Sequence, residues 1–164
     1  MSDTQLFAFE SDFVATLRCI PMAVRLKLDV CGIKLSLRQW SRFARSDREI
    51  LLTMRCGSRG EVEAYRAEVV DLVVSRAGEA AKPLAEPVWR HWERLDRVPT
   101  AVVDYATSLG LSPPSRSQWA ALTSLQRFTL IKLTRDNHDN VNFAPAMREF
   151  GLARAPVPAP MSSA

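Results

Sequence analysis

IPMAV at residues 20–24 recurs as VPTAV at residues 98–102, and SLRQWSRF at residues 36–43 recurs as SRSQWAAL at residues 115–122. The first pair of stretches is 78 positions apart and the second pair is 79 positions apart, so the later copy contains one extra residue, near Pro113. Self-similarity at a fixed spacing indicates that one structural unit is used twice. It predicts how the fold is built and says nothing of what the protein does.

Helix signals predict the same elements in both copies. Pro21 and Pro99 suit the first turn of a helix, where a missing N–H costs nothing, and Gly32 suits the end of one. Each copy then carries two capping boxes, in which a Ser or Thr side chain and a Glu or Gln three residues later satisfy backbone donors. The four predicted boxes are Ser36 with Gln39, Ser46 with Glu49, Ser115 with Gln118, and Thr123 with Gln126. We expect each copy, at about residues 20–54 and 98–133, to form a long helix, a short helix and a third helix.

Weaker signals cover the remaining segments. We expect an extended stretch at residues 6–9, a short helix after Ser11, an amphipathic helix over about 61–76 and a connector over 81–97. The connector is interrupted by proline and has a short helix around Trp89 and Trp92. Pro145 is expected to open a final helix that ends near Phe150. Together these signals predict an all-α fold, a single compact helical domain over residues 1–152 with a flexible, disordered tail over 153–164.

Basic residues gather in the first copy. The chain has a formal net charge of +4, and residues 18–48 hold eight Arg and Lys against two Asp. Such a bias favours an acidic partner or nucleic acid, although a solvated helix face explains it more simply. The residues that we assign to a partner surface are Arg18, Arg25, Lys34, Arg38, Arg42, His138 and Asp139.

Three cysteines also belong to the first copy or its edges. Cys19, Cys31 and Cys56 align with Arg97, Leu109 and Arg135 of the second copy, so the repeated fold does not need the thiols. Their spacing matches no paired-cysteine metal site, and free cysteine is commonly buried. A metal site of Cys19, Cys31, Cys56 and His138 fits by ligand type, yet His138 lies in an Asn- and Asp-rich stretch that equally suits a turn.

Trp40 and Trp119 occupy equivalent positions and lie on the apolar sides of their predicted helices. Core packing explains them better than a role as partner hot spots. No phosphate loop, H-E-x-x-H, G-x-S-x-G or other catalytic motif is present, so we expect no enzyme activity. We expect a cytoplasmic protein because the first residues lack the features of a signal peptide and no apolar run approaches the length of a membrane span.

Several stretches carry a resemblance to a known family. They are FExDFV at residues 9–14, LRCIPM at 17–22, LDxCGIKL at 28–35, QWxxLTxLQRF at 118–128, LIKL at 130–133, NF at 142–143 and EFGL at 149–152. Through them, residues 7–152 resemble the bacterial nitrate reductase associated proteins, and residues 17–35 are the most specific part. The family is named for genes that lie beside those for assimilatory nitrate reductase and its molybdenum cofactor.

The resemblance implies an accessory protein that active nitrate reductase requires, with no established catalytic residues and no established cofactor. We expect it to support assembly or maturation by binding the apoenzyme or the molybdenum-cofactor assembly machinery. Two alternatives stay open. The three thiols suggest a carrier of a metal or an iron–sulfur cluster, and the basic charge suggests a nucleic-acid-binding regulator of nitrate assimilation. We do not expect nucleic acid or membrane partners, because the third helix of each copy is too apolar to read base edges.

Overall fold

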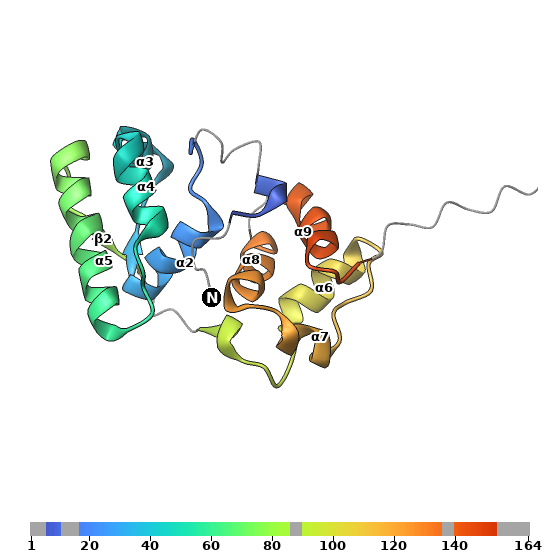
Figure 1. The fold of residues 1–164 in the computed structure, drawn as a ribbon. Coiled ribbons are helices and arrows are strands. Elements are labelled where there is room, and N and C mark those ends of the chain that lie inside the picture. Colours follow the sequence, from blue (N-terminus) through green and yellow to red (C-terminus); the bar gives the residue numbers. More distant parts are fainter. Residues whose placement is uncertain (1–5, 11–16, 86–89, 136–139, 154–164) are drawn as a thin grey trace, which may run out of the picture. The chain divides into compact units, whose positions relative to one another are not determined.

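The computed structural model describes residues 6–10, 17–85, 90–135 and 140–153. Their contacts divide the chain into two compact units, Met1–Arg90 and His91–Ala164, and each unit is described by itself. The described residues are mostly helical (Figure 1), which confirms the all-α fold class. The single domain over residues 1–152 and the shared design of the two copies stay predictions, and the tail from residue 154 lies outside the described residues.

The first unit is built around helix α2. Its elements are η1 (Ala8–Glu10), α2 (Met22–Cys31), β1 (Ile33–Lys34), α3 (Leu37–Arg42), α4 (Arg45–Thr53), α5 (Arg59–Leu72), the π-helical turn η2 (Val73–Ala77) and β2 (Lys82–Pro83). Strands β1 and β2 pair antiparallel, an element that the sequence patterns did not predict. Seven of the ten residues of α2 are buried, and α2 packs against both α4 and α5.

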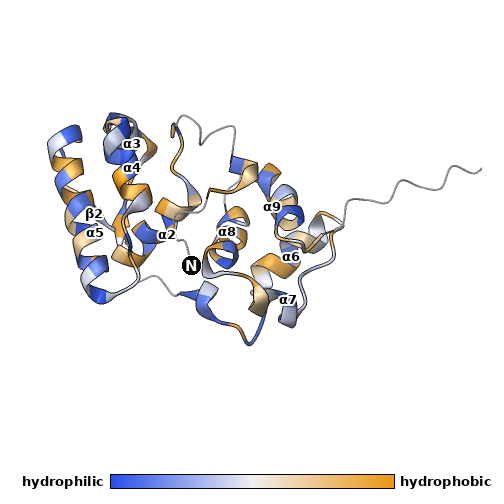
Figure 2. Ribbon diagram, viewed as in Figure 1, coloured by the Kyte–Doolittle hydropathy of each residue, from blue (hydrophilic) through white to orange (hydrophobic). Residues whose placement is uncertain are grey.

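The second unit is built around helix α8. Its elements are η3 (His91–Glu93), α6 (Thr100–Ser108), α7 (Arg116–Ala121), α8 (Ser124–Leu133), η4 (Asn140–Asn142) and α9 (Phe143–Glu149). Seven of the ten residues of α8 are buried, and α8 contacts η3, α6 and α9. Apolar and polar residues alternate along the helices of both units (Figure 2), as expected for helices that bury one side. No helix within the described ranges is both long and apolar enough to span a membrane.

Three of the four predicted capping boxes are confirmed. Ser36, Ser115 and Thr123 each accept a hydrogen bond from a backbone N–H through the side-chain oxygen, and the glutamine three residues later accepts one in return. The predicted box of Ser46 with Glu49 is wrong. Helix α4 begins at Arg45, because the Asp47 carboxylate accepts a hydrogen bond of 2.8 Å from the backbone N–H of Ala44.

With α4 beginning at Arg45, the third helices of the two copies begin at equivalent positions. The third helix of each copy now begins after Ala44 and after Thr123, which are 79 positions apart, as are Trp40 and Trp119. Ala44 has no side-chain acceptor, so only the Asp47 half of a capping box is present in the first unit.

Other boundaries differ from the predicted ones in small ways. Residues 8 and 9 of the stretch expected to be extended lie instead in the 3-10 turn η1, where the Glu10 carboxylate accepts hydrogen bonds from the backbone N–H groups of Phe7 and Met22. Helix α5 begins at Arg59, two residues before the predicted start, and α9 begins two residues before Pro145. The short helix near Trp92 is confirmed as η3, whereas the helix expected after Ser11 and residue Trp89 lie outside the described residues.

Trp40 and Trp119 are fully buried, which confirms the core interpretation. A buried indole N–H needs an acceptor. Trp40 Nε1 donates to the carbonyl oxygen of Leu17 at 2.8 Å, and Trp119 Nε1 donates to that of Arg94 at 2.9 Å. Both acceptors precede the first long helix of their unit, so each tryptophan attaches an upstream backbone segment to the helical core.

An arginine at matching positions reinforces each attachment. Arg48 Nη1 donates to the same Leu17 oxygen at 3.1 Å, and Arg127 Nε donates to the carbonyl oxygen of Trp92 at 2.6 Å. Arg127 also donates to the carbonyl oxygen of Leu122. Arg127 is buried, so its guanidinium satisfies backbone oxygens that water does not reach.

We predict that Arg127→Met lowers the free energy of unfolding by about 2–4 kcal/mol, because it leaves two buried carbonyl oxygens without a charged donor. Urea unfolding followed by tryptophan fluorescence measures the change. Arg116→Met, on the exposed side of α7, is the matched control and should change stability by less than about 0.5 kcal/mol. Equal losses in both variants would contradict the structural role of Arg127.

Candidate functional site

Four basic side chains of the first unit form what we call the α3 surface: Lys34, Arg38, Arg42 and Lys82. Lys34 lies directly opposite Lys82 in the register of β1 and β2. Arg38 and Arg42 are exposed and one turn apart on α3. The pairing of Lys34 with Lys82 creates a local excess of positive charge. Like charges directly opposite one another in a sheet repel, so this arrangement is unfavourable for the pairing.

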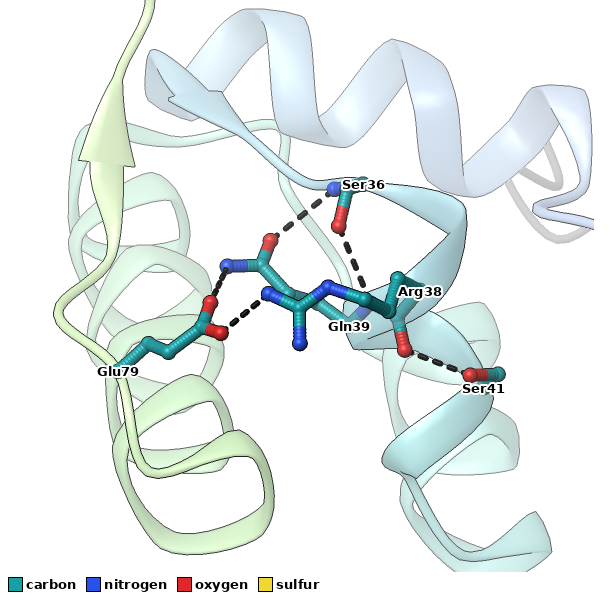
Figure 3. Close-up of polar contacts among 5 residues, drawn as sticks. All are labelled: Ser36, Arg38, Gln39, Ser41 and Glu79. Atoms are coloured by element: carbon teal, nitrogen blue, oxygen red, sulfur yellow. Dashed lines mark hydrogen bonds and ion pairs between the residues drawn. The ribbon is translucent and has the colours of Figure 1, made fainter.

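Glu79 is the acidic partner of this surface. Figure 3 shows its carboxylate facing α3, where it accepts hydrogen bonds from the Arg38 guanidinium and, at 3.0 Å, from Gln39 Nε2. The hydrogen bond from Arg38, followed by that from Gln39, lowers the pKa of Glu79, so the group is ionised at neutral pH. Arg38 and Lys82 both act on this carboxylate by their charge, and one acidic group among four basic side chains leaves the α3 surface with a positive charge.

Gln39 connects this surface to the helix start. Its side-chain oxygen accepts from the backbone N–H of Ser36 at 3.0 Å, while its side-chain nitrogen donates to Glu79 (Figure 3). Gln39 is buried, and Arg38 next to it is exposed. The capping box therefore fixes the geometry of α3 while the Arg38 side chain stays at the surface.

The π-helical turn η2 attaches α5 to the helices beside it. Arg76 of η2 donates to both carboxylate oxygens of Asp47, at 2.9 and 3.3 Å. Burial by itself would raise the pKa of Asp47, but the hydrogen bonds from Arg76 and from the Ala44 N–H outweigh it and lower the pKa. Glu79 follows η2 by two residues, so this turn supplies partners to both α3 and α4. Short π-helical segments occur frequently at functional sites.

Two apolar side chains are exposed on α3 and η2. Leu37 of α3 has 55% of its surface exposed and Val74 of η2 has 54%, and the two elements contact one another. Trp40, the aromatic residue of α3, is fully buried and therefore offers no ring on which a base stacks. Arginine beside exposed apolar groups is typical of protein–protein interfaces.

The remaining residues predicted for a partner surface have different surroundings. Arg18 is exposed, whereas Arg25 is half-buried and donates to the carbonyl oxygen of Ile20 at 3.2 Å. This contact gives Arg25 a role in holding the start of α2. His138 and Asp139 lie outside the described residues.

Lys27 and Arg48 join Arg25 in having structural roles, whereas the other five basic residues between 18 and 48 are exposed, as a solvated face requires. Lys27 is buried, and its Nζ donates to the carbonyl oxygens of Leu52 and Met54 at 2.7 and 2.6 Å, at the end of α4. Arg48 binds backbone carbonyls, as described above. A cation favours the carbonyl end of a helix, but sequence spacing gave no sign that α4 would end beside Lys27.

The cysteines do not share one environment. Cys31 and Cys56 are buried in the core of the first unit, and Cys19 is half-buried. Burial is the largest effect on the Cys31 thiol and raises its pKa, which favours the neutral thiol over the thiolate that binds metals. Among the described residues, no three His, Cys, Asp or Glu side chains gather closely enough to hold a metal ion. Because His138 lies outside these residues, the four-residue metal site stays a prediction.

The comparisons with known proteins assign this chain to a family. The family model described as conserved nitrate reductase-associated protein matches residues 6–150. The chain belongs to this family. The match confirms the resemblance carried by residues 7–152 and covers both units of the structure. No curated protein and no solved structure matches the chain.

We predict that Cys19 reacts with a maleimide at least about tenfold faster than Cys31 and Cys56 in the folded protein, because a buried thiol reacts only when the surrounding structure opens. Mass spectrometry of labelled peptides over time at pH 7.5 measures the three rates. In urea the three rates should become similar. Equal rates in the folded protein would show that the core around Cys31 and Cys56 is open.

Proposed function

We propose that this nitrate reductase-associated protein is a non-catalytic accessory factor of assimilatory nitrate reductase. In this proposal it acts in the cytoplasm and supports assembly or maturation of the enzyme, by binding the apoenzyme or a partner in the molybdenum-cofactor assembly machinery. Membership of the family over residues 6–150 is the observation that carries the proposal.

The α3 surface is the contact that we propose for this partner. Its cations are presented on elements with fixed geometry, since Gln39 caps α3 and Glu79 links α3 to the segment after η2. A rigid surface loses little conformational freedom on binding. Its charge would speed the encounter with an acidic partner and favour the correct orientation, while exposed Leu37 and Val74 would supply apolar contact area.

A triple charge reversal tests the contact. Lys34→Glu, Arg42→Glu and Lys82→Glu together should weaken binding to apo nitrate reductase at least about tenfold, which corresponds to about 1.4 kcal/mol. Arg38 is left in place because it holds Glu79. The matched control reverses the same number of charges at exposed Arg55, Arg59 and Arg116. Calorimetry or surface plasmon resonance at two salt concentrations measures the affinity.

The cellular counterpart uses a strain from which the gene has been deleted. Nitrate reductase activity should fall in the deletion strain, return with the wild-type gene and the control variant, and stay low with the triple variant at equal protein level. Unchanged activity in the deletion strain would contradict the accessory function. Full rescue by the triple variant would contradict only the assignment of the α3 surface.

A further inference from the structure

The second unit contains a pocket of about 290 Å³ with a basic lining. Four of its residues carry basic side chains: His91, Arg94, Arg97 and Arg135. The others are Pro99, Thr100, Ala101 and Ile131, so the described lining includes no carboxylate. The volume lies at the small end of the range of about 300–1,000 Å³ that is common for ligand pockets. A concave site whose described lining carries several cations and no carboxylate is suited to a small negatively charged ligand.

Hydrogen bonds from α7 and α8 hold the backbone segment that carries His91 and Arg94. The carbonyl oxygen of Arg94 accepts the indole N–H of Trp119, and that of Trp92 accepts from Arg127. Trp92 itself is buried and packs edge-on against the ring of Phe128, with 5.2 Å between the ring centroids. The segment that contains His91 and Arg94 is therefore attached to α7 and α8, and the pocket wall that it forms is pre-organised.

Two of the arginines are available for a ligand. Arg94 donates to both oxygens of Asp96, at 3.1 and 3.3 Å, so its charge is offset in part. Within the described residues, neither Arg97 nor Arg135 takes part in an ion pair, and both are exposed. The hydrogen bond from Arg94 is the main cause that lowers the pKa of Asp96, and the charge of Arg97 adds a weaker attraction to the same carboxylate. Arg97 precedes α6 and Arg135 follows α8, so the two guanidinium groups enter the pocket lining from different elements.

The remaining lining residues add backbone N–H groups and apolar surface to the pocket. Thr100 and Ala101 form the first turn of α6, whose N-cap residue Pro99 offers no side-chain acceptor to the backbone N–H groups there. Those groups add partial positive charge to the cationic side chains. Pro99 and the buried Ile131 supply apolar surface beside them. The pocket thus combines donors for an anion with a wall suited to a short organic group.

We infer that this pocket binds a small phosphate monoester. Guanidinium groups bind pairs of phosphate oxygens through parallel N–H donors. Arginines on separate elements suit a tetrahedral dianion, whose oxygens point in several directions, better than a planar carboxylate, which one arginine satisfies. The apolar wall and the volume leave room for the esterified group. This site is independent of the α3 surface and adds a small-molecule ligand to the proposed function.

The experiment titrates the full-length protein with glycerol 3-phosphate, inorganic phosphate and glycerol, using calorimetry together with amide chemical shifts. Glycerol 3-phosphate should bind and shift amide signals in residues 91–101 and at Arg135, and glycerol should not bind. Weaker binding of inorganic phosphate would show that the pocket also contacts the organic group, and equal binding would show that the phosphate alone is recognised. Both results support an anion site, and the absence of binding by both phosphates would overturn it.

Variants separate this pocket from general charge effects. Arg97→Gln with Arg135→Gln should weaken phosphate binding at least about tenfold, since it removes two charged donors from a shared ligand. Arg97→Lys with Arg135→Lys keeps the charge and should give an intermediate loss. Arg55→Gln with Arg116→Gln removes the same charge elsewhere and should bind as the wild type does. Wild-type affinity in the first variant, or equally tight binding of single-stranded DNA, would overturn the proposal.

Discussion

A buried indole N–H must find an acceptor, and in this protein the acceptor is the backbone that leads into a unit's first helix. Trp40 binds the carbonyl oxygen of Leu17, and Trp119 binds that of Arg94. A buried donor without an acceptor costs about 1–3 kcal/mol, so the upstream segment cannot leave without a penalty. The arginine eight positions after each tryptophan adds a charged donor to the same region, as Arg48 does at Leu17.

The attachment has different consequences in the two units. In the first unit it holds Leu17 at a φ of 50°, a left-handed conformation that a leucine rarely adopts. Two donors on its carbonyl and the burial of its side chain compensate for that strain. In the second unit the same device holds the backbone between Trp92 and Arg94, which forms one wall of the basic pocket. The same pair of donors, a tryptophan and an arginine, therefore holds a strained leucine in the first unit and one wall of the basic pocket in the second.

Local signals in the sequence predicted local structure well. Proline and glycine marked both ends of α2, three capping boxes marked helix starts, and the apolar context of Trp40 and Trp119 indicated burial. The start of α4 was missed because its N-cap is an alanine, and the Asp47 carboxylate does the capping from inside the helix. Lys27 looked like any surface lysine, since its acceptors lie at the end of a helix 25 or more residues away.

The candidate sites were predictable only in part, for the same physical reason. Lys34, Arg38 and Arg42 stand out as basic residues in one stretch, but Lys82 joins them only through the pairing of β1 with β2. The pocket of the second unit takes Arg97 from the segment before α6 and Arg135 from the segment after α8, and no spacing rule connects them. The alignment of the copies did give a hint, because these two arginines replace Cys19 and Cys56 of the first copy.

In both units the tryptophan indole N–H holds the segment upstream of the first helix. Hydrogen exchange measured by mass spectrometry on Trp119→Phe tests it most directly, because this change removes the N–H and keeps an aromatic ring. Loss of the Trp119 N–H should accelerate exchange chiefly in residues 91–97, while α9 and the first unit exchange as in the wild type. Unchanged exchange in residues 91–97, or an equal acceleration throughout the second unit, would contradict it.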